Sequence, residues 1–298
     1  MNPVRCGVAG SPIAHSLSPV LHRAAYDALG LDWRYAAHEV DEAGLTGFLA
    51  DLCRDWRGLS LTMPLKEAAL AACAEIGETA RLVSAVNTIV IDAAGRRVGH
   101  NTDVAGFVAA WREGSLVPSA DGSTGAARLE SAVVIGGGAT ARSALAALAE
   151  IGCRRVTVLS RSAERAAALT ALFGELGMSG TVGSLASAAP HALGPVQLVV
   201  STVPAPAHAD VLASPAVRAL LARRVPLFDV TYGPRDSALV SAARRAGGSC
   251  SDGFPLLLHQ AVGQVELFTG CTDSPLEAMR AAGLASLRAR AEREREPG

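Results

Sequence analysis

The chain has 298 residues, half of them apolar and 18% charged, and its formal net charge is −1. These values predict a soluble globular protein of about two domains and exclude a disordered chain. A charge near zero also argues against a nucleic-acid or membrane partner bound by charge, and no apolar run is long enough to span a membrane.

The first 113 residues alternate short apolar runs with helical patterns. We expect strands at 5–10, 33–40 and 58–61, and helices at 18–30, 42–53, 65–77 and 102–113. Ser18 is the expected N-cap of the first helix, with Pro19 at the first helical position and Gly30 at the end. Residues 86–101 are expected to form a hairpin that turns at Ala94–Gly95.

The pattern breaks at residues 114–128, GSLVPSADGSTGAAR, which are small and polar and have no periodicity. They predict a flexible linker or surface loop between two domains. Beyond them, strands and helices alternate over 131–174, and two more buried strands are expected within 196–205 and 225–232. This alternation predicts a parallel sheet covered by helices on both faces.

The C-terminal part is helical by its pattern. Pro255 is expected to open a helix over 255–270. Ser274, Pro275 and Glu277 predict a capping box at the start of a second helix, over 274–296. The last turns are almost entirely arginine and glutamate, which predicts a solvated helix end.

The cysteines and the N-terminus bear on the compartment. The six cysteines are scattered without a C-x-x-C pair, so we expect reduced thiols. No group of histidine, cysteine and acidic residues has metal-ligand spacing, and we expect no metal. The first residues lack the pattern of a signal peptide, so we expect a cytoplasmic protein.

A glycine-rich turn follows the first strand after the linker. Gly136-x-Gly138-x-x-Ala141 lies between a strand and a helix, where glycines permit a tight turn and a close approach to a pyrophosphate. A purely structural turn is the alternative. Because strand, turn, helix and next strand follow in order, we favour a dinucleotide site.

The end of the next strand bears on which dinucleotide binds. An acidic residue there would hold the ribose 2′-hydroxyl of NAD, but this chain has Ser160-Arg161-Ser162 and then Arg165. A guanidinium and two hydroxyls suit a 2′-phosphate, so NADP is favoured over NAD. Arg142 is either a further phosphate ligand or an exposed helix residue.

Lys66 is the only lysine among the 27 lysine and arginine residues. Codon drift explains arginine where only surface charge is needed, but it fails where the chemistry needs an amine that gives up a proton. Serines at positions 16 and 18 near a helix start can bind a carboxylate, although Ser18 alone is explained by capping. An acidic residue at position 103 is explained equally well by the dipole of the helix that begins there. A lysine at position 66 is explained equally well by chance survival of one lysine codon.

These segments, in their order, resemble shikimate dehydrogenase along nearly the whole chain. The resemblance rests on GSPIAHSLSP, LTMPLKE, SAVNT, HNTDVAGF, IGGGATAR, SRSAERA, DVTYGP and DGFPLLLHQA. It implies an α/β fold of two domains with a deep cleft between them. Residues 1–112, completed by helices at 255–298, would form the substrate-binding and catalytic domain, residues 129–254 a Rossmann-type NADP domain, and residues 113–128 a linker or insertion.

The resemblance also implies roles for individual residues in the reversible reduction of 3-dehydroshikimate to shikimate by NADPH. Lys66 and Asp103 would be the catalytic pair. The substrate, a small molecule, would be bound by Ser16, Ser18, Thr62, Asn87, Asp103, Tyr232 and Gln260. NADP would be bound by Gly136, Gly137, Gly138, Ala139, Thr140, Ser160, Arg161, Ser162 and Arg165, with Thr202, Val203, Val230, Gly253 and Glu78 as further cofactor residues. A monomer or a homodimer is expected.

The chain departs from the family pattern at several places. The usual glycine-alanine-glycine-glycine is Gly136 to Ala139 here, the usual Asn-Arg-Thr is Ser160 to Ser162, and His22 is followed by Arg23 where an amide is usual. Residues 114–128 have the character of an insertion.

Three other functions remain possible from the sequence. The first is a quinate/shikimate dehydrogenase that prefers NAD, and the second is a non-catalytic NADP-binding module. The third is another lysine-using oxidoreductase, such as a methylenetetrahydrofolate dehydrogenase. The absence of an acidic residue after the second strand of the cofactor domain argues against the NAD-preferring enzyme. The set of Lys66, Asn87 and Asp103 argues against a non-catalytic module. The serine pair argues against a methylenetetrahydrofolate dehydrogenase.

Overall fold

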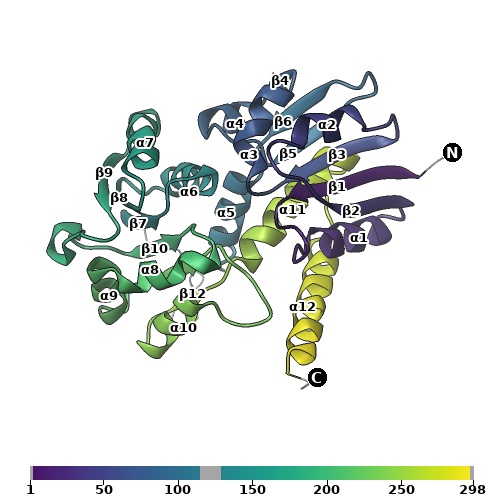
Figure 1. Cartoon of the computed structure of the whole chain (residues 1–298). Coiled ribbons are helices and arrows are strands. Elements are labelled where there is room, and N and C mark those ends of the chain that lie inside the picture. The colour runs from purple at the N-terminus through teal and green to yellow at the C-terminus, as the bar shows by residue number, and fades with distance from the viewer. Residues whose placement is uncertain (1–2, 115–128, 296–298) are drawn as a thin grey trace. The chain divides into compact units, whose positions relative to one another are not determined.

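The computed structural model describes residues 3–114 and 129–295, except for the side chains of 163–166. It divides into two compact units, Met1–Gly106 with Leu257–Gly298, and Phe107–Leu256, and each is described on its own (Figure 1). Most of the expected linker, residues 115–128, lies outside the described residues.

The first unit is built on a mixed sheet of six strands in the order β2-β1-β3-β5-β6-β4. β1 is parallel to β2 and β3, whereas β5 is antiparallel to β3 and β6. The elements up to the last of these strands are β1 (Val4–Gly10), α1 (Ser18–Ala28), β2 (Trp33–Glu39), α2 (Leu45–Ala50), β3 (Trp56–Leu61), α3 (Leu65–Ala68), the 3-10 helix η1 (Ala69–Ala72), β4 (Glu75–Ile76), α4 (Glu78–Leu82), β5 (Thr88–Ile91) and β6 (Arg97–His100). The expected hairpin is confirmed by the β5–β6 pairing.

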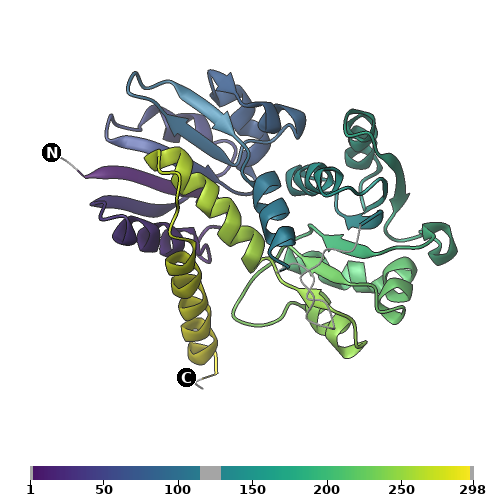
Figure 2. The ribbon, with the colours of Figure 1, turned by 180° about the vertical axis from the view of Figure 1, so that it is seen from behind.

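Helices from distant parts of the chain complete this unit. α5 (Asp103–Arg112) begins in the first unit, and α11 (Phe254–Thr269) and α12 (Leu276–Arg293) return to it. Figure 2 shows α11 running across the sheet and α12 beside α1. The Phe268 ring of α11 fills the space above Gly58 of β3, so the apolar side of α11 closes the core.

The second unit has a parallel sheet in the order β12-β11-β10-β7-β8-β9, which is the doubly wound strand order of dinucleotide-binding folds. All five residues of β7 are buried, as expected of a central strand covered on both faces. The elements are β7 (Ser131–Ile135), α6 (Ala139–Glu150), β8 (Arg155–Ser160), α7 (Ala163–Glu175), β9 (Ser179–Ser184), η2 (Pro190–Leu193), β10 (Leu198–Ser201), η3 (Ala205–Ala207), α8 (His208–Ala213), α9 (Pro215–Ala222), β11 (Leu227–Asp229), α10 (Ala238–Arg245) and β12 (Cys250–Ser251). The expected α/β fold class is confirmed.

Both predicted N-terminal helix caps are wrong. Ser18 is the first residue of α1 and not its cap, because Leu17 already has helical backbone angles, and the Ser18 N–H donates to Ser16 Oγ instead. α12 begins after Pro275 without a side-chain cap, and the Ser274 hydroxyl instead lies 3.5 Å from the Val262 carbonyl of α11. The Ser274 hydroxyl is therefore used in a contact with another helix and is not available for a capping box at the start of α12.

Two predicted helices are too long. The helix expected over 65–77 is broken into α3 and η1, and its end is extended, because the Ala74 and Gly77 N–H groups donate to Arg97 and Gly99 carbonyls beside β6. The helix expected over 42–53 is only α2. Strand pairing here outweighs the helix propensity of an alanine-rich segment.

Over residues 3–114 and 129–295, no helix is both long enough and apolar enough to cross a bilayer. Within the same residues, no three histidine, cysteine or acidic side chains gather into a possible metal site.

Candidate functional site

Lys66 and Asp103 form an ion pair in the first unit. Lys66 lies in α3, directly after the loop that follows β3, and Asp103 is the first residue of α5. Lys66 Nζ donates to Asp103 Oδ2 at 2.6 Å, and the two side chains are only 14% and 9% exposed. Water therefore reaches little of either side chain, and the two charges attract each other more strongly than a pair on the surface would.

Asn87 holds the other oxygen of the same carboxylate. Its Nδ2 donates to Asp103 Oδ1 and to Thr102 Oγ1, both at 2.9 Å. Its Oδ1 accepts from the Thr102 N–H at 2.8 Å and from the Thr88 hydroxyl at 2.8 Å. Asn101 Oδ1 accepts from the Asp103 N–H at 3.0 Å, which holds the first turn of α5. Both polar atoms of the Asn87 side chain are thus hydrogen-bonded, and its Nδ2 contacts the carboxylate directly.

Gln260 and Thr62 border this group. Gln260 Oε1 lies 3.5 Å from Asn87 Nδ2, and its Nε2 donates to the Leu257 carbonyl at 2.8 Å. The Thr62 N–H donates to the Ala9 carbonyl, and its own carbonyl accepts from the Leu65 N–H at the start of α3. The structure therefore brings Lys66, Asn87, Asp103 and Gln260 together, with Thr62 at the start of the Lys66 turn.

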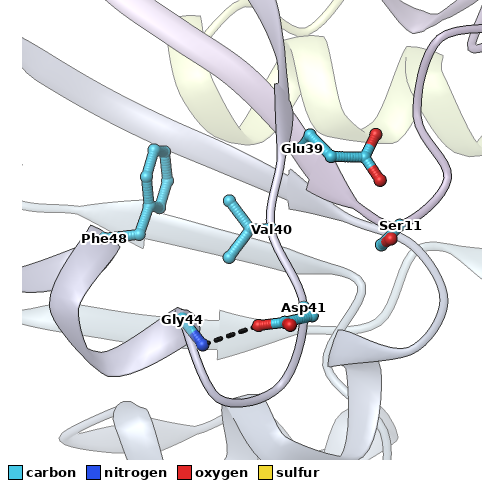
Figure 3. A pocket seen from close by; sticks show the side chains of 6 residues that line it. All are labelled: Ser11, Glu39, Val40, Asp41, Gly44 and Phe48. Atoms are coloured by element: carbon cyan, nitrogen blue, oxygen red, sulfur yellow. Dashed lines mark hydrogen bonds between the residues drawn. The ribbon is translucent and has the colours of Figure 1, made fainter.

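The two serines lie at the start of α1. Ser16 is half-buried, and Ser18 is only 5% exposed. The loop that carries them is held by Glu39, whose Oε2 accepts from the Ile13 N–H at 2.9 Å. Glu39 and Ser11 also line an open pocket of about 350 Å³, with Val40, Asp41, Gly44 and Phe48 (Figure 3).

The glycine-rich turn lies in the second unit, between β7 and α6. Gly136 has φ +121°, and a Cβ there would overlap Thr202 Oγ1, so only glycine fits. A Cβ on Gly138 would meet nothing within 4 Å, so this backbone is open toward a ligand. No side chain caps α6, whose N-terminus follows Gly138. The turn thus fits a pyrophosphate, with Gly137, Ala139 and Thr140 on its half-buried rim.

The end of β8 carries the expected 2′-phosphate residues. Ser160 is buried, and its Oγ accepts from the Ser162 N–H at 3.2 Å. Arg161 is exposed and forms an ion pair with Asp210 of α8 at 2.9 Å. Arg165 lies in the first turn of α7, but its side chain is outside the part that the structure describes.

The remaining expected cofactor residues, except Glu78, follow the carboxyl ends of β10, β11 and β12. Thr202 Oγ1 donates to the Ile135 carbonyl, and Val203 packs beside Gly136. The Val230 N–H donates to the Ser201 carbonyl, and the Gly253 N–H to the Thr231 carbonyl. Tyr232 follows on the same loop and is half-buried.

Glu78 belongs to the first unit. It opens α4 and, with His100, Asn101 and Thr102 among other residues, lines a cavity of about 150 Å³. Burial lowers the pKa of the neighbouring His100, which favours its neutral form. Glu78 is therefore placed beside the backbone that leads into Asp103.

Sequence reasoning missed several residues that support the site. Thr102 and Thr88 lie within the HNTDVAGF and SAVNT segments but were given no role, and Gln264 lies outside every segment that carries the resemblance. One signal was present, because Gln264 follows Gln260 by four residues and so lies on the same face of one helix. In the second unit, buried Asp229 accepts from the hydroxyls of Thr231 and Ser237 and holds the loop that carries Tyr232.

Family models and known proteins similar to this chain include shikimate dehydrogenases. A family model for the shikimate dehydrogenase substrate binding domain matches residues 8–89, and one for shikimate / quinate 5-dehydrogenase matches residues 120–237. The shikimate dehydrogenase (NADP(+)) of Methylobacterium radiotolerans is 37% identical over 275 residues, which cover 89% of this chain and 91% of that protein.

Two solved structures extend the likeness. The structure of Mycobacterium tuberculosis shikimate dehydrogenase has a TM-score of 0.79 and 37% identity, and covers 95% of this chain and 100% of its own. Shikimate 5-dehydrogenase from Thermus thermophilus, solved in complex with NADP(H) and shikimate, has a TM-score of 0.75 and 29% identity, over 95% of this chain and 99% of its own.

Proposed function

The chain belongs to the shikimate dehydrogenase family, and on that premise we propose that Lys66 and Asp103 catalyse the reversible, NADPH-dependent reduction of 3-dehydroshikimate to shikimate. The enzyme is an NADP-dependent oxidoreductase of the shikimate pathway. The observation that carries the assignment of roles is the screened ion pair of 2.6 Å between Lys66 Nζ and Asp103 Oδ2, whose other oxygen is held by Asn87.

The ion pair suits the proton transfer that this reaction needs. Bound NADPH supplies a hydride to the ketone carbon, and the ketone oxygen becomes negatively charged. The Lys66 ammonium stabilises that charge and donates a proton to the oxygen, which yields the hydroxyl group. In the reverse direction the neutral amine takes the hydroxyl proton. Asp103 keeps the Lys66 head group at a fixed place throughout.

We propose the remaining roles as the sequence analysis stated them. Ser16 and Ser18 would bind the substrate carboxylate, and Thr62, Asn87, Tyr232 and Gln260 its ring groups. The open turn at Gly138 supports pyrophosphate binding by residues 136–140, and Ser160 to Arg165 would receive the 2′-phosphate. Residues 1–112 with 255–298 would form the catalytic domain and residues 129–254 the NADP domain. The cytoplasmic location and the monomeric or homodimeric state also stay predictions.

Replacement of Lys66 tests the proposed chemistry. Lys66→Arg keeps the positive charge beside Asp103 but removes the transferable proton. We expect kcat for shikimate oxidation to fall by about 10²- to 10⁴-fold, with NADPH binding unchanged in fluorescence titration. Arg34→Lys, an exchange at an exposed position of β2, serves as the control and should leave kcat as it is.

The same assay tests the substrate and the cofactor. Wild-type enzyme is offered shikimate and quinate, each with NADP⁺ and NAD⁺, and the rate is followed by NAD(P)H absorbance. Shikimate with NADP⁺ should be the fastest pair. Activity confined to quinate or to NAD⁺ would overturn the proposed function, and a Lys66→Arg enzyme with normal turnover would overturn the acid–base role.

A further inference from the structure

We propose that Gln264 and Thr88 are positioning residues, which fix the orientation of the Asn87 side-chain amide and, through it, that of the Asp103 carboxylate. This inference rests on the proposed function, because it concerns the carboxylate that is paired with Lys66. All the residues that carry it lie in the first unit. Neither Gln264 nor Thr88 touches Lys66 or Asp103 by any hydrogen bond that the structure describes, so both act through Asn87.

The Gln264 amide lies at the centre of a buried polar array. Its Nε2 donates to Thr88 Oγ1 at 3.0 Å and to the Asn87 carbonyl at 3.3 Å. Its Oε1 accepts from Ser60 Oγ at 2.8 Å and from His22 Nε2 at 3.2 Å. Gln264 is 1% exposed, so all four of these interactions replace hydrogen bonds that water would otherwise provide.

The direction of every hydrogen bond toward Asp103 follows from backbone groups. The Asn87 carbonyl can only accept, so the Gln264 atom beside it is the nitrogen. The Thr102 N–H can only donate, so the Asn87 atom beside it is the oxygen. Thr88 Oγ1, which accepts from Gln264, must therefore point its single proton at Asn87 Oδ1. Asn87 is left with its Nδ2 toward Asp103.

The reversed orientation of Asn87 is blocked by the same contacts. A rotated amide would place its oxygen against the Asp103 carboxylate and its nitrogen against the Thr102 N–H. It would also take away the acceptor of the Thr88 proton, because the amide nitrogen would then face that hydroxyl. Gln264 and Thr88 thus keep the Asn87 amide in the orientation that holds the catalytic carboxylate.

The far side of the array keeps Gln264 in place. His22 is fully buried and stacks on the Tyr35 ring at 4.0 Å. Burial lowers the pKa of His22 to about 3, so the ring is neutral and bears its proton on Nε2, where it donates to Gln264. Tyr35 donates to Ser60 Oγ at 2.7 Å, and Ser60 in turn donates to Gln264.

Two variants of Thr88 separate positioning from packing. Thr88→Val keeps the shape but removes the hydroxyl that donates to Asn87, and Thr88→Ser keeps the hydroxyl but loses a buried methyl group. We expect kcat to fall on the order of 10- to 100-fold in Thr88→Val, with the KM for shikimate little changed. Thr88→Ser should stay within about threefold of wild type, even though it also loses stability.

Gln264→Glu provides the second measurement. It preserves size and removes the Nε2 donors to Thr88 and to the Asn87 carbonyl, so kcat should fall by a similar factor. Tyr26→Phe is the matched control in the same array. It removes only the hydroxyl 3.4 Å from His22 Nδ1 and should leave kcat within about twofold. If Gln264→Glu fails to fold, the Thr88 pair still decides.

The outcomes distinguish this inference from the proposed function. If the wild type does not oxidise shikimate with NADP⁺, both are overturned. If the wild type is active and Thr88→Val is as fast as Thr88→Ser, or if kcat follows the melting temperature across all variants, the positioning role alone is overturned. A loss of kcat in Thr88→Val and Gln264→Glu, with rescue in Thr88→Ser, supports it.

Discussion

The ion pair between Lys66 and Asp103 matters more for the proposed chemistry than for the free energy of unfolding. Charges that are 14% and 9% exposed lose much of their hydration, and their attraction roughly offsets that cost. Breaking such a pair is a different matter, because the partner left behind is uncompensated. The Asn87 amide and the Asp103 backbone N–H contacts keep the pair in one arrangement, which an acid–base role requires.

His22 shows how a buried base makes stability depend on pH. Burial lowers its pKa from 6.5 to about 3, whereas in the unfolded chain it protonates near 6.5. Its contribution is therefore complete above about pH 6.5 and is lost as pH falls from there toward 3. Between pH 6.5 and 5, this group alone should lower the free energy of unfolding by about 2 kcal/mol.

Urea unfolding of wild type and His22→Asn at several pH values measures this term. The variant should be less stable at pH 7, and its stability should fall less steeply between pH 6.5 and 5. Other titrating groups affect both proteins equally and cancel in the comparison. If the free energy of unfolding falls with pH equally steeply in the two proteins, His22 is not protected from protonation in the folded state.

At the scale of elements, α5 and α11 approach each other unusually closely at Gly106. A Cβ on Gly106 would lie 2.7 Å from the Gln260 backbone nitrogen and 2.9 Å from the Gln260 Cβ. Such contacts are shorter than packed atoms accept, so a side chain here must push the helices apart. This approach carries Asp103 on α5 and Gln260 on α11 to the same place.

Gly106→Ala should therefore damage both stability and activity. We expect a loss of about 1–3 kcal/mol in the free energy of unfolding, and a kcat reduced beyond what the unfolded fraction explains. Gly47→Ala in α2 is the matched control, because a Cβ there meets nothing within 4 Å. It should be neutral or stabilise by up to about 1 kcal/mol. Equal behaviour of the two variants in chemical denaturation and turnover would contradict this account of the close approach.

Two of the strands that sequence reasoning missed, β4 and β9, have weak local signals. β9 has the sequence SGTVGS, is mostly exposed and lies at the edge of the parallel sheet, so it shows neither an apolar run nor a buried face. β4 is two residues long and exists through its pairing with β6. In contrast, β7 and β10 were predicted because a central strand must be apolar on both faces.

At the scale of the whole molecule, the two units carry different parts of the proposed site. Lys66, Asn87, Asp103 and Gln260 belong to the first unit, and the Gly136 turn belongs to the second. Each unit has its own apolar core. A ligand that binds to one unit should therefore slow hydrogen exchange mainly in that unit.

Hydrogen exchange measured by mass spectrometry tests this division. Shikimate alone should slow exchange around residues 16–20, 62–66 and 86–104, and NADP⁺ alone around residues 136–142 and 160–162, because bound ligand reduces local opening. NAD⁺ at the same concentration is the control for the 2′-phosphate and should protect 160–162 less. Protection by NADP⁺ that is absent from the glycine-rich turn would refute its assignment as the pyrophosphate site.

The sequence by itself determined the features that depend on neighbouring residues. The strand, glycine turn and helix at 131–150 follow from local patterns, and Lys66 stood out because a lysine among arginines needs a chemical reason. Those features locate the proposed cofactor turn and one proposed catalytic group. They do so because backbone conformation and side-chain chemistry at these positions are set within a few residues.

Only the tertiary structure decided which distant residues share a hydrogen bond. The Asp103 carboxylate is held by Asn87, Asn87 by Thr88, and Thr88 by Gln264, which is 176 residues further along the chain. The same is true of Ser274, whose hydroxyl lies against α11 and not at a helix cap. Hydrogen bonds in a core are chosen by whichever partners the packed helices and strands bring within reach, and no local pattern specifies that choice.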